Sequence, residues 1–185
     1  MNLLARISDF IDRANERLGR FVCWLTLAMV LIASYNALAR YIGKYAGHNL
    51  TSNALVETQW YLFSIVFLLG AAYALKHNAH VRVDVLYDRL GARSRAWINL
   101  VGAVVFLVPF CILCIWTSWR PVASSWAILE TSPDPGGLPR YPIKTLIPVA
   151  FVLIVIQGVS EIIKAMLILR GDEAAPATDR EVDAL

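Results

Sequence analysis

Charged side chains are scarce in this chain of 185 residues. Asp, Glu, Lys and Arg together make up 17% of it and hydrophobic residues 58%, with a mean hydropathy of +0.56. Soluble domains carry about 25% charged and about 45–50% apolar residues. A compact domain of this size cannot bury so large an apolar excess in long continuous runs. The composition therefore excludes a soluble enzyme and a nucleic-acid-binding protein.

Four stretches contain no Asp, Glu, Lys or Arg at all. They cover residues 96–119, 21–39, 58–75 and 145–160, and are 24, 19, 18 and 16 residues long. A helix needs about 20 mostly apolar residues to cross a hydrocarbon core of about 30 Å. With their flanks, the stretches predict transmembrane helices at 21–41, 55–75, 95–119 and 143–169. The expected fold class is an all-α integral membrane protein with four spans and additional amphipathic interfacial helices.

Cysteine and histidine are also rare, at three residues each. Cys111 and Cys114 have the C-x-x-C spacing of metal and redox sites, but they fall in the apolar middle of the third predicted span without a nearby histidine. Free cysteines commonly pack as small hydrophobic residues. We therefore expect no metal, no cofactor and no catalytic residue, and interpret this pair as packing residues.

Ionisable residues are absent from the centres of the predicted spans, where an ion or solute pathway usually places them. No internal repeat of the kind that builds self-contained transporters is evident. A membrane haem protein would need ligating histidines inside its spans, whereas His48, His77 and His80 fall in loops. A supporting membrane subunit is the preferred interpretation. An electron-transfer membrane anchor and an autonomous small channel or carrier stay open as alternatives.

The distribution of Lys and Arg predicts the topology. Of the 17 basic residues, 12 lie before the first span, from Lys76 to Arg95 around the connection between the second and third, and from Lys164 onward at the end of the fourth. Basic segments stay cytoplasmic, so both termini are expected in the cytoplasm and the 120–142 segment outside. Ala37-Leu38-Ala39 resembles a signal-peptidase site, but the preceding apolar run exceeds the usual length of about 7–15 residues. We therefore expect the first span to be retained.

The segments outside the spans have distinct patterns. Residues 1–20 and 80–93 repeat their apolar positions with a helical period, which predicts amphipathic helices at the cytoplasmic interface. A helical cap packed on the rest of the protein is an equally good interpretation of 1–20. Residues 120–142, rich in Pro and Gly, predict a shaped loop. The acidic tail, 171–185, is expected to be disordered.

Several residues within the spans predict local structure. Gly70 and Ala74 form a stripe of small residues that allows another helix to approach closely. Trp60 belongs to an interfacial aromatic belt. Pro109 removes a backbone hydrogen bond and predicts a kink. Glu161 and Lys164 are spaced to pair with each other.

One series of motifs resembles a known family. Val56-Glu57-Thr58-Gln59-Trp60 leads into Leu69-Gly70-Ala71-Ala72, and His80-Val81-Arg82-Val83-Asp84 follows. Ala39-Arg40-Tyr41 ends the first span, and Gly137-Leu138-Pro139-Arg140-Tyr141-Pro142 leads into the fourth. In order and spacing, these resemble the small membrane (Q) subunit of tripartite ATP-independent periplasmic (TRAP) transporters. The resemblance covers about residues 20–170.

The resemblance implies a function and partners. A Q subunit supports a large elevator-type membrane (M) subunit that carries the solute and sodium sites. A periplasmic solute-binding (P) protein delivers the solute, usually a carboxylate, and a sodium gradient drives uptake. The chain would then be a non-enzymatic scaffold in the bacterial inner membrane, in contact with lipid, the M subunit and the P protein.

The same resemblance suggests which residues meet the partners. Those expected at the subunit interface are Arg40, Glu57, Trp60, Gly70, Ala74, His80 and Asp84. Arg40 and Glu57 lie at the same outer membrane interface, so they could also pair with each other. Those expected to dock the solute-binding protein are Trp126, Glu130, Asp134 and Arg140.

Overall fold

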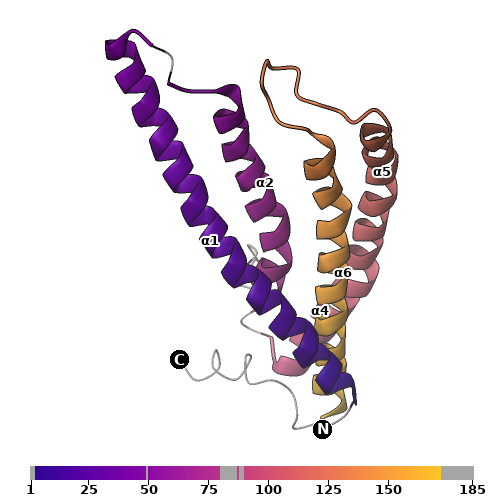
Figure 1. Ribbon diagram of the computed structural model, residues 1–185. Helices are drawn as coiled ribbons and strands as arrows, with labels where there is room; N and C mark the ends of the chain where they lie inside the picture. Colours follow the sequence, from indigo (N-terminus) through magenta and orange to yellow (C-terminus); the bar gives the residue numbers. More distant parts are fainter. Residues whose placement is uncertain (1–2, 49, 80–86, 88–89, 172–185) are drawn as a thin grey trace.

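The computed structural model describes residues 3–48, 50–79, 87 and 90–171. Its helices are α1 (Leu3–Ala46), α2 (Asn53–Lys76), α4 (Ala92–Val101), the π-helix η1 (Gly102–Leu107), α5 (Val108–Ala127) and α6 (Tyr141–Arg170). Because α4, η1 and α5 run on without a gap, this part of the chain forms four long apolar helices, each able to cross a membrane. The expected four-span, all-helical architecture is confirmed for the described residues (Figure 1).

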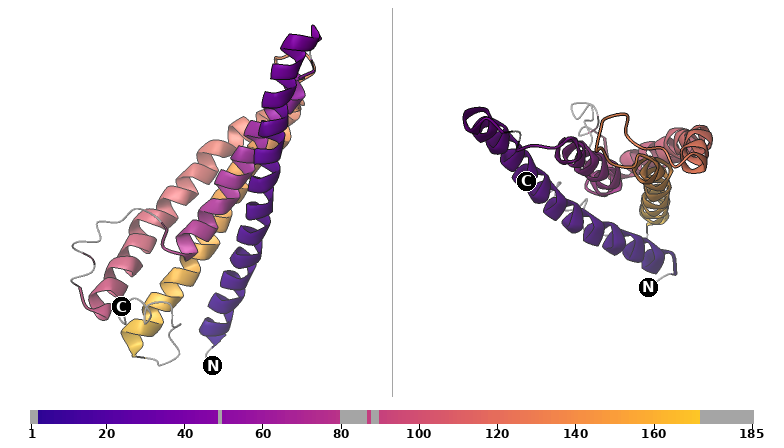
Figure 2. Two further views of the ribbon diagram at one scale, coloured as in Figure 1. Left: turned by 90° about the vertical axis from the view of Figure 1, so that its left-hand side faces the viewer. Right: turned by 45° about the horizontal axis from the view of Figure 1, so that its top comes forward.

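Helix α6 lies at the centre of the bundle. It packs against α1 and α2 on one side and against α4, η1 and α5 on the other (Figures 1 and 2). Helix α1 starts beside the last turns of α6, so one end of the molecule holds both the beginning of α1 and the end of α6. We call this the terminal end. The opposite end, which carries residues 128–140, is called the loop end.

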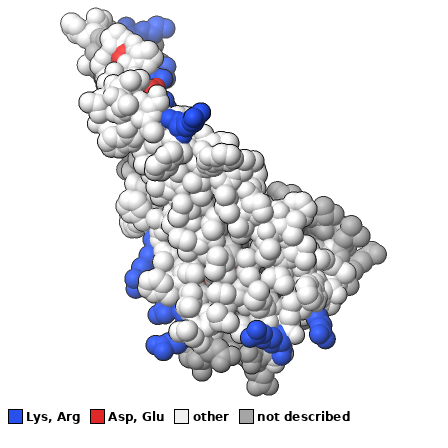
Figure 3. All heavy atoms as spheres, turned by 90° about the vertical axis from the view of Figure 1, so that its right-hand side faces the viewer, with Lys and Arg blue, Asp and Glu red and all other residues white. Residues whose placement is uncertain are grey.

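The outer surface of the bundle is apolar. Large hydrophobic side chains remain exposed along every long helix, including Trp24 on α1, Phe67 on α2 and Trp116 on α5. In Figure 3, most of the visible face is uncharged, and Lys and Arg side chains lie toward its two ends. Exposing this surface to water would cost a free energy of about 25 cal/mol for each Å² of apolar area. An apolar belt between two basic ends is the surface that a lipid bilayer requires.

The segment expected as a separate interfacial helix at 1–20 is continuous with the first span. Helix α1 runs from Leu3 to Ala46 without interruption. Its N-terminal part packs against α6, and Ala5 contributes to a hydrophobic cluster with Ile163 and Leu167 of that helix. The structure thus has the packed arrangement that the sequence left open beside the interfacial one.

The expected loop at 120–142 is shorter than predicted. Helix α5 continues through Pro121 to Ala127, and α6 begins at Tyr141. A proline removes one hydrogen bond to the preceding turn, but the residues after it can remain helical. Val122 and Ser125 are buried on the inner face of this extension. The expected bounds of 120–142 were therefore too wide, and the loop covers 128–140.

The irregularity expected around Pro109 takes the form of a π-helix. The N–H of Val108 bonds to the carbonyl of Ala103, five residues earlier, which widens the turn just before the proline. η1 meets α6 at Gly158, where an added Cβ would lie 2.7 Å from Leu107. Two expected segments fall largely outside the described residues. These are the 80–93 helix, at 80–86 and 88–89, and the tail, at 172–185.

Candidate functional site

Residues 128–140, which we call the outer loop, fold into a compact turn at the loop end. Thr131 and Pro139 form an isolated antiparallel bridge, and Arg140 N donates to Glu130 O at 2.8 Å. At the tip, Gly137 N donates to Asp134 O at 3.0 Å. Gly136 adopts φ 71°, a left-handed conformation that glycine tolerates best. The backbone itself therefore gives the loop a defined shape.

Glu57, in the first turns of α2, anchors this loop. Its side chain is buried, with 3% exposure, and accepts hydrogen bonds from the Ser132 hydroxyl and the backbone N–H of Leu138. A Cβ at Gly137 would lie 2.8 Å from Glu57 Oε1, so the carboxylate fits only because this residue has no side chain. Tyr61, one turn further along α2, donates its hydroxyl to Pro139 O at 3.0 Å. Asn53, the first residue of α2, also donates its side-chain amide to Pro135 O at 3.0 Å, so helix α2 holds the loop through three side chains.

Glu130 anchors the loop to the helices on its other side. It pairs with Lys144 at the start of α6 and accepts a hydrogen bond from the Ser125 hydroxyl at 2.7 Å. The hydrogen bond from Lys144, followed by that from Ser125, holds the pKa of Glu130 below its usual value. Trp126 donates to Thr145 Oγ1 at 2.8 Å. The outer loop is therefore tied to α2, α5 and α6 together.

The loop also presents groups to solvent. Asp134 is exposed at its tip. Ile128 and Leu129 are 69% and 60% exposed at its start. Leu129 has φ 47°, a conformation that costs a non-glycine residue of order 1–3 kcal/mol and persists only where the surrounding structure holds it. Next to it, the hydrogen bond from Glu130 N to Ser125 O, at 3.0 Å, holds the backbone. The exposed surface of this firmly held loop thus includes one carboxylate and two large apolar side chains.

The four residues expected to dock a partner have different positions. Trp126 and Glu130 are engaged in holding the loop, as described above. Arg140 lies over the Trp60 ring, 5.9 Å from its centroid. Of the four, Asp134 has the most open position for a contact with another protein, since it belongs to the exposed tip.

The residues expected at the subunit interface are also separated. Glu57 turns to the outer loop, whereas Arg40 is exposed on α1, so the structure does not bring these two together. Gly70 and Ala74 are half-buried, and a Cβ at Gly70 would be 3.8 Å from Val22, an ordinary contact. Within this chain the close approach is instead at Gly19. His80 and Asp84 lie outside the described residues.

A polar network at the terminal end was not predicted. Ser8 and Asn15 of α1 meet Ser160 and Gln157 of α6, with side-chain distances of 2.7 and 2.5 Å. Asp12, between them on the same face, pairs with Lys164 at 2.7 Å. The i, i+4, i+7 spacing of the three α1 residues is a polar stripe that the sequence does contain. The helical period expected for 1–20 does not distinguish this stripe from the rest of the polar face.

Gln157 and Lys164 extend the polar network between α1 and α6. Gln157 also donates to Asp12 and Glu161, at 3.1 and 3.0 Å. Lys164 bonds Glu161 at 2.8 Å, which confirms the predicted pair. A second α1 contact lies nearby, where Glu16 pairs with Lys76 at 2.5 Å. Because buried polar groups are costly unless paired, these contacts fix the angle of α1 against α2 and α6.

Comparison with known families decides the identity. The family described as "Tripartite ATP-independent periplasmic transporters, DctQ component" matches residues 29–167, well over half of the chain. The chain belongs to the DctQ family. The matched region contains α2, the outer loop and most of α6. It leaves out the N-terminal part of α1, which carries the polar stripe.

Two curated proteins are similar to it. One is the C4-dicarboxylate TRAP transporter small permease protein DctQ of Vibrio cholerae, 30% identical over 136 residues, or 71% of this chain. The other is the isethionate TRAP transporter permease protein DctMQ of Oleidesulfovibrio alaskensis, 27% identical over 132 residues. The chain spans 54% and 20% of their lengths. No solved structure matches it.

Family membership confirms the resemblance found in the motifs. The chain is a small permease subunit of the TRAP type, a multi-pass membrane protein and a transporter component, not an enzyme. The family match favours this assignment over the electron-transfer anchor that the residues alone left open.

Proposed function

We propose that this small permease subunit is a fixed scaffold for a large TRAP membrane subunit in the bacterial inner membrane. Its termini lie in the cytoplasm and the outer loop in the periplasm. The charge pattern supports this orientation, because most Lys and Arg residues fall on segments that the fold gathers at the terminal end. The polar network between α1 and α6 supports a rigid role, since it locks the longest helix at one angle.

The large partner is the membrane subunit that carries the solute and sodium sites. Support comes from the name of the DctMQ relative and from the small share of that protein, 20%, that this chain spans. The exposed apolar faces of α1 and α5 offer enough surface for both a partner and lipid. Transport by this chain alone is not part of the proposal.

The outer loop contributes to docking of a periplasmic solute-binding protein. The observation that carries the docking role is the anchoring of the outer loop. The carboxylates of Glu57 and Glu130 both bind this thirteen-residue turn and hold it in one conformation. A preorganised loop loses less conformational entropy when a partner binds. Asp134 and Leu129 are then the contact residues, and Trp126, Glu130 and Arg140 support them.

The transported solute is a carboxylate, taken up with sodium. The C4-dicarboxylate named for the Vibrio cholerae relative supports a carboxylate. Selectivity resides in the partner subunits.

Uptake by the reconstituted three-component system tests the docking role. Trimming residues 132–139, or the milder change Asp134→Lys, is expected to lower uptake while the membrane complex still co-purifies. Asp9→Lys, which reverses an exposed carboxylate at the opposite end, is the matched control and is expected to leave uptake unchanged. Normal uptake with the trimmed loop would remove this loop from docking, and loss of the complex would make its role structural.

A further inference from the structure

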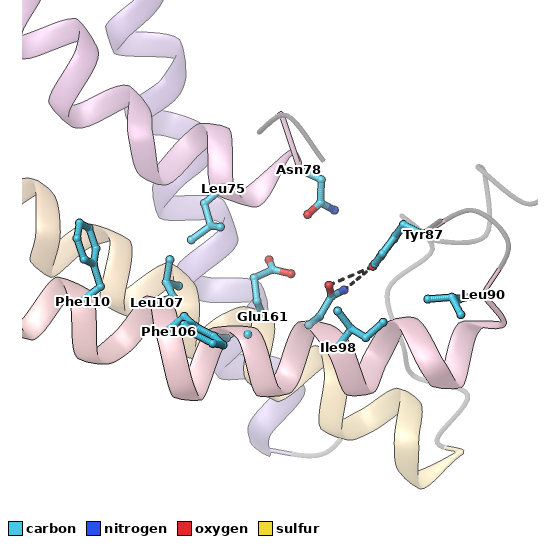
Figure 4. A pocket seen from close by; sticks show the side chains of 12 residues that line it. Leu75, Asn78, Tyr87, Leu90, Ile98, Phe106, Leu107, Phe110 and Glu161 are labelled. Carbon is cyan, nitrogen blue, oxygen red and sulfur yellow. Dashed lines mark hydrogen bonds between the residues drawn. The ribbon is translucent and has the colours of Figure 1, made fainter. Parts of the chain in front are cut away.

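A cavity of about 760 Å³ opens at the terminal end, away from the outer loop. The residues that line it come from the end of α2, the segment before α4, the π-helix and its neighbours, and α6. The side chains in Figure 4 include Leu75, Ile98, Phe106 and Phe110, with the carboxylate of Glu161 rising from α6 among them. Its volume lies in the range of about 300–1,000 Å³ that small-molecule sites occupy.

The cavity is polar at one end and apolar at the other. Asn78, Asn99 and Tyr87 line it near the terminal end, where Asn99 and Tyr87 bond each other at 2.8 Å. Phe106 and Phe110 line it toward the middle of the bundle. Eleven residues separate Asn99 from Phe110, which corresponds to about 16 Å along a helix. That is about half of a hydrocarbon core of about 30 Å, the depth of one leaflet.

Among the described residues that line the cavity, Glu161 carries the one acidic side chain. Its carboxylate shares the ammonium of Lys164 with Asp12, which does not line the cavity, and among the described residues no other cation is within ion-pair distance of either carboxylate. The contacts that Glu161 receives from Lys164 and Gln157 both fall on Oε1. Neither of these two contacts uses Oε2, the second oxygen of the Glu161 side chain, which lines the cavity (Figure 4). A cationic donor placed there would balance the cluster.

We propose that this cavity binds a phospholipid with a primary ammonium headgroup, that is, phosphatidylethanolamine. The ammonium hydrogen-bonds to Glu161, and one acyl chain lies along Phe106 and Phe110 toward the middle of the bilayer. Phosphatidylcholine carries the same charge without an N–H donor, and phosphatidylglycerol has a net negative charge and no ammonium to donate to the Glu161 carboxylate. The site therefore discriminates by headgroup, and the bound lipid stabilises the junction of α2, η1 and α6.

Native mass spectrometry of the full chain, released from nanodiscs of defined lipid, tests this. Wild-type protein is expected to retain phosphatidylethanolamine in preference to the other two lipids. Glu161→Gln should weaken that retention about tenfold, because a hydrogen bond between charged groups is lost. Glu16→Gln, which removes a carboxylate that does not line the cavity, is the matched control and should retain the lipid.

A second variant guards against a simple folding defect. Gly102 lines the cavity, and an added Cβ there would meet nothing within 4 Å, so Gly102→Leu fills the space without touching the carboxylates. It is expected to lower retention of all three lipids at unchanged secondary structure. Equal retention of the three lipids by wild-type protein, a preference that survives Glu161→Gln, or unchanged retention in Gly102→Leu would overturn the proposal.

The identity of the occupant is tested in the membrane itself. A photo-crosslinking amino acid replacing Phe106, which is 72% exposed, should form adducts with the mass of a lipid. Adducts with a polypeptide, whether a partner subunit or this chain's own residues, would overturn the lipid assignment.

Discussion

At the scale of single residues, a few side chains do most of the positioning. Glu57 and Glu130 each hold the outer loop to a different helix, and both are surrounded by donors that only the folded chain brings together. Gly137 leaves room for one of these carboxylates. The residues that hold the loop are therefore distinct from those free to contact a partner, such as Asp134.

The pH dependence of stability is predicted at Glu130. Its pKa is lower in the folded protein than in the unfolded chain, so its contribution to stability is present above the unfolded pKa and is lost as the pH falls through the folded value. The difference in melting temperature between wild-type protein and Glu130→Gln should be largest near neutral pH and should close in the acidic range, below about pH 4. A difference that is independent of pH would show that the Lys144 pair does not contribute.

Close helix packing is predicted at Gly19 rather than at Gly70. A Cβ at Gly19 would overlap the Tyr73 ring, whereas one at Gly70 would make only an ordinary contact with Val22. Gly19→Ala is expected to destabilise the chain by about 1–3 kcal/mol, as overpacking does, and Gly70→Ala to leave its stability unchanged or slightly higher. Thermal unfolding of the two variants in the same detergent checks this. Equal melting temperatures would contradict the packing of α1 on α2 described above.

At the scale of elements, the contact between α1 and α6 explains how a helix of 44 residues is held. Its N-terminal part carries a polar stripe and meets the polar face at the end of α6. The stripe of Ser8, Asp12 and Asn15 resembles an ordinary solvated face, because the partner residues are more than 140 positions away in the sequence. The spans were predictable from hydropathy alone, whereas such long-range polar pairs were not.

The same limit applies to the loop end. The Pro and Gly residues correctly predicted a shaped loop, but the predicted start at 120 is too early, because α5 continues through Pro121 to Ala127. Glu57 was recognised as an interfacial charge, yet its bonds to Ser132 and Leu138 join residues that are 75 and 81 positions apart. Local patterns carry no information about such partners.

The network is predicted to matter most at Gln157, which is fully buried. Gln157→Leu removes its bonds to Asp12 and Glu161 and leaves the buried Asn15 amide without its partner. Leaving buried polar groups unpaired costs about 1–3 kcal/mol for each group. The melting temperature should fall clearly, whereas Ile156→Leu, at an exposed neighbouring position, should leave it unchanged. A variant as stable as wild type would mean that α1 is held by apolar contacts alone.

At the scale of the whole molecule, one apolar bundle has two unlike ends. The terminal end fixes α1 through paired polar groups, and the loop end presents an anchored turn. Between them lies an apolar surface suited to lipid and to another membrane protein. Membership of the DctQ family agrees with a subunit embedded in the membrane. The rigid support that we propose for it is consistent with this division.

The central claim is that the chain works as the small permease subunit of a larger transporter. Affinity purification of the full chain from its native membrane in mild detergent, with its partners identified, tests it most directly. The expected result is recovery of a large polytopic membrane protein without haem. Recovery of the chain alone, or together with a redox enzyme, would contradict the account.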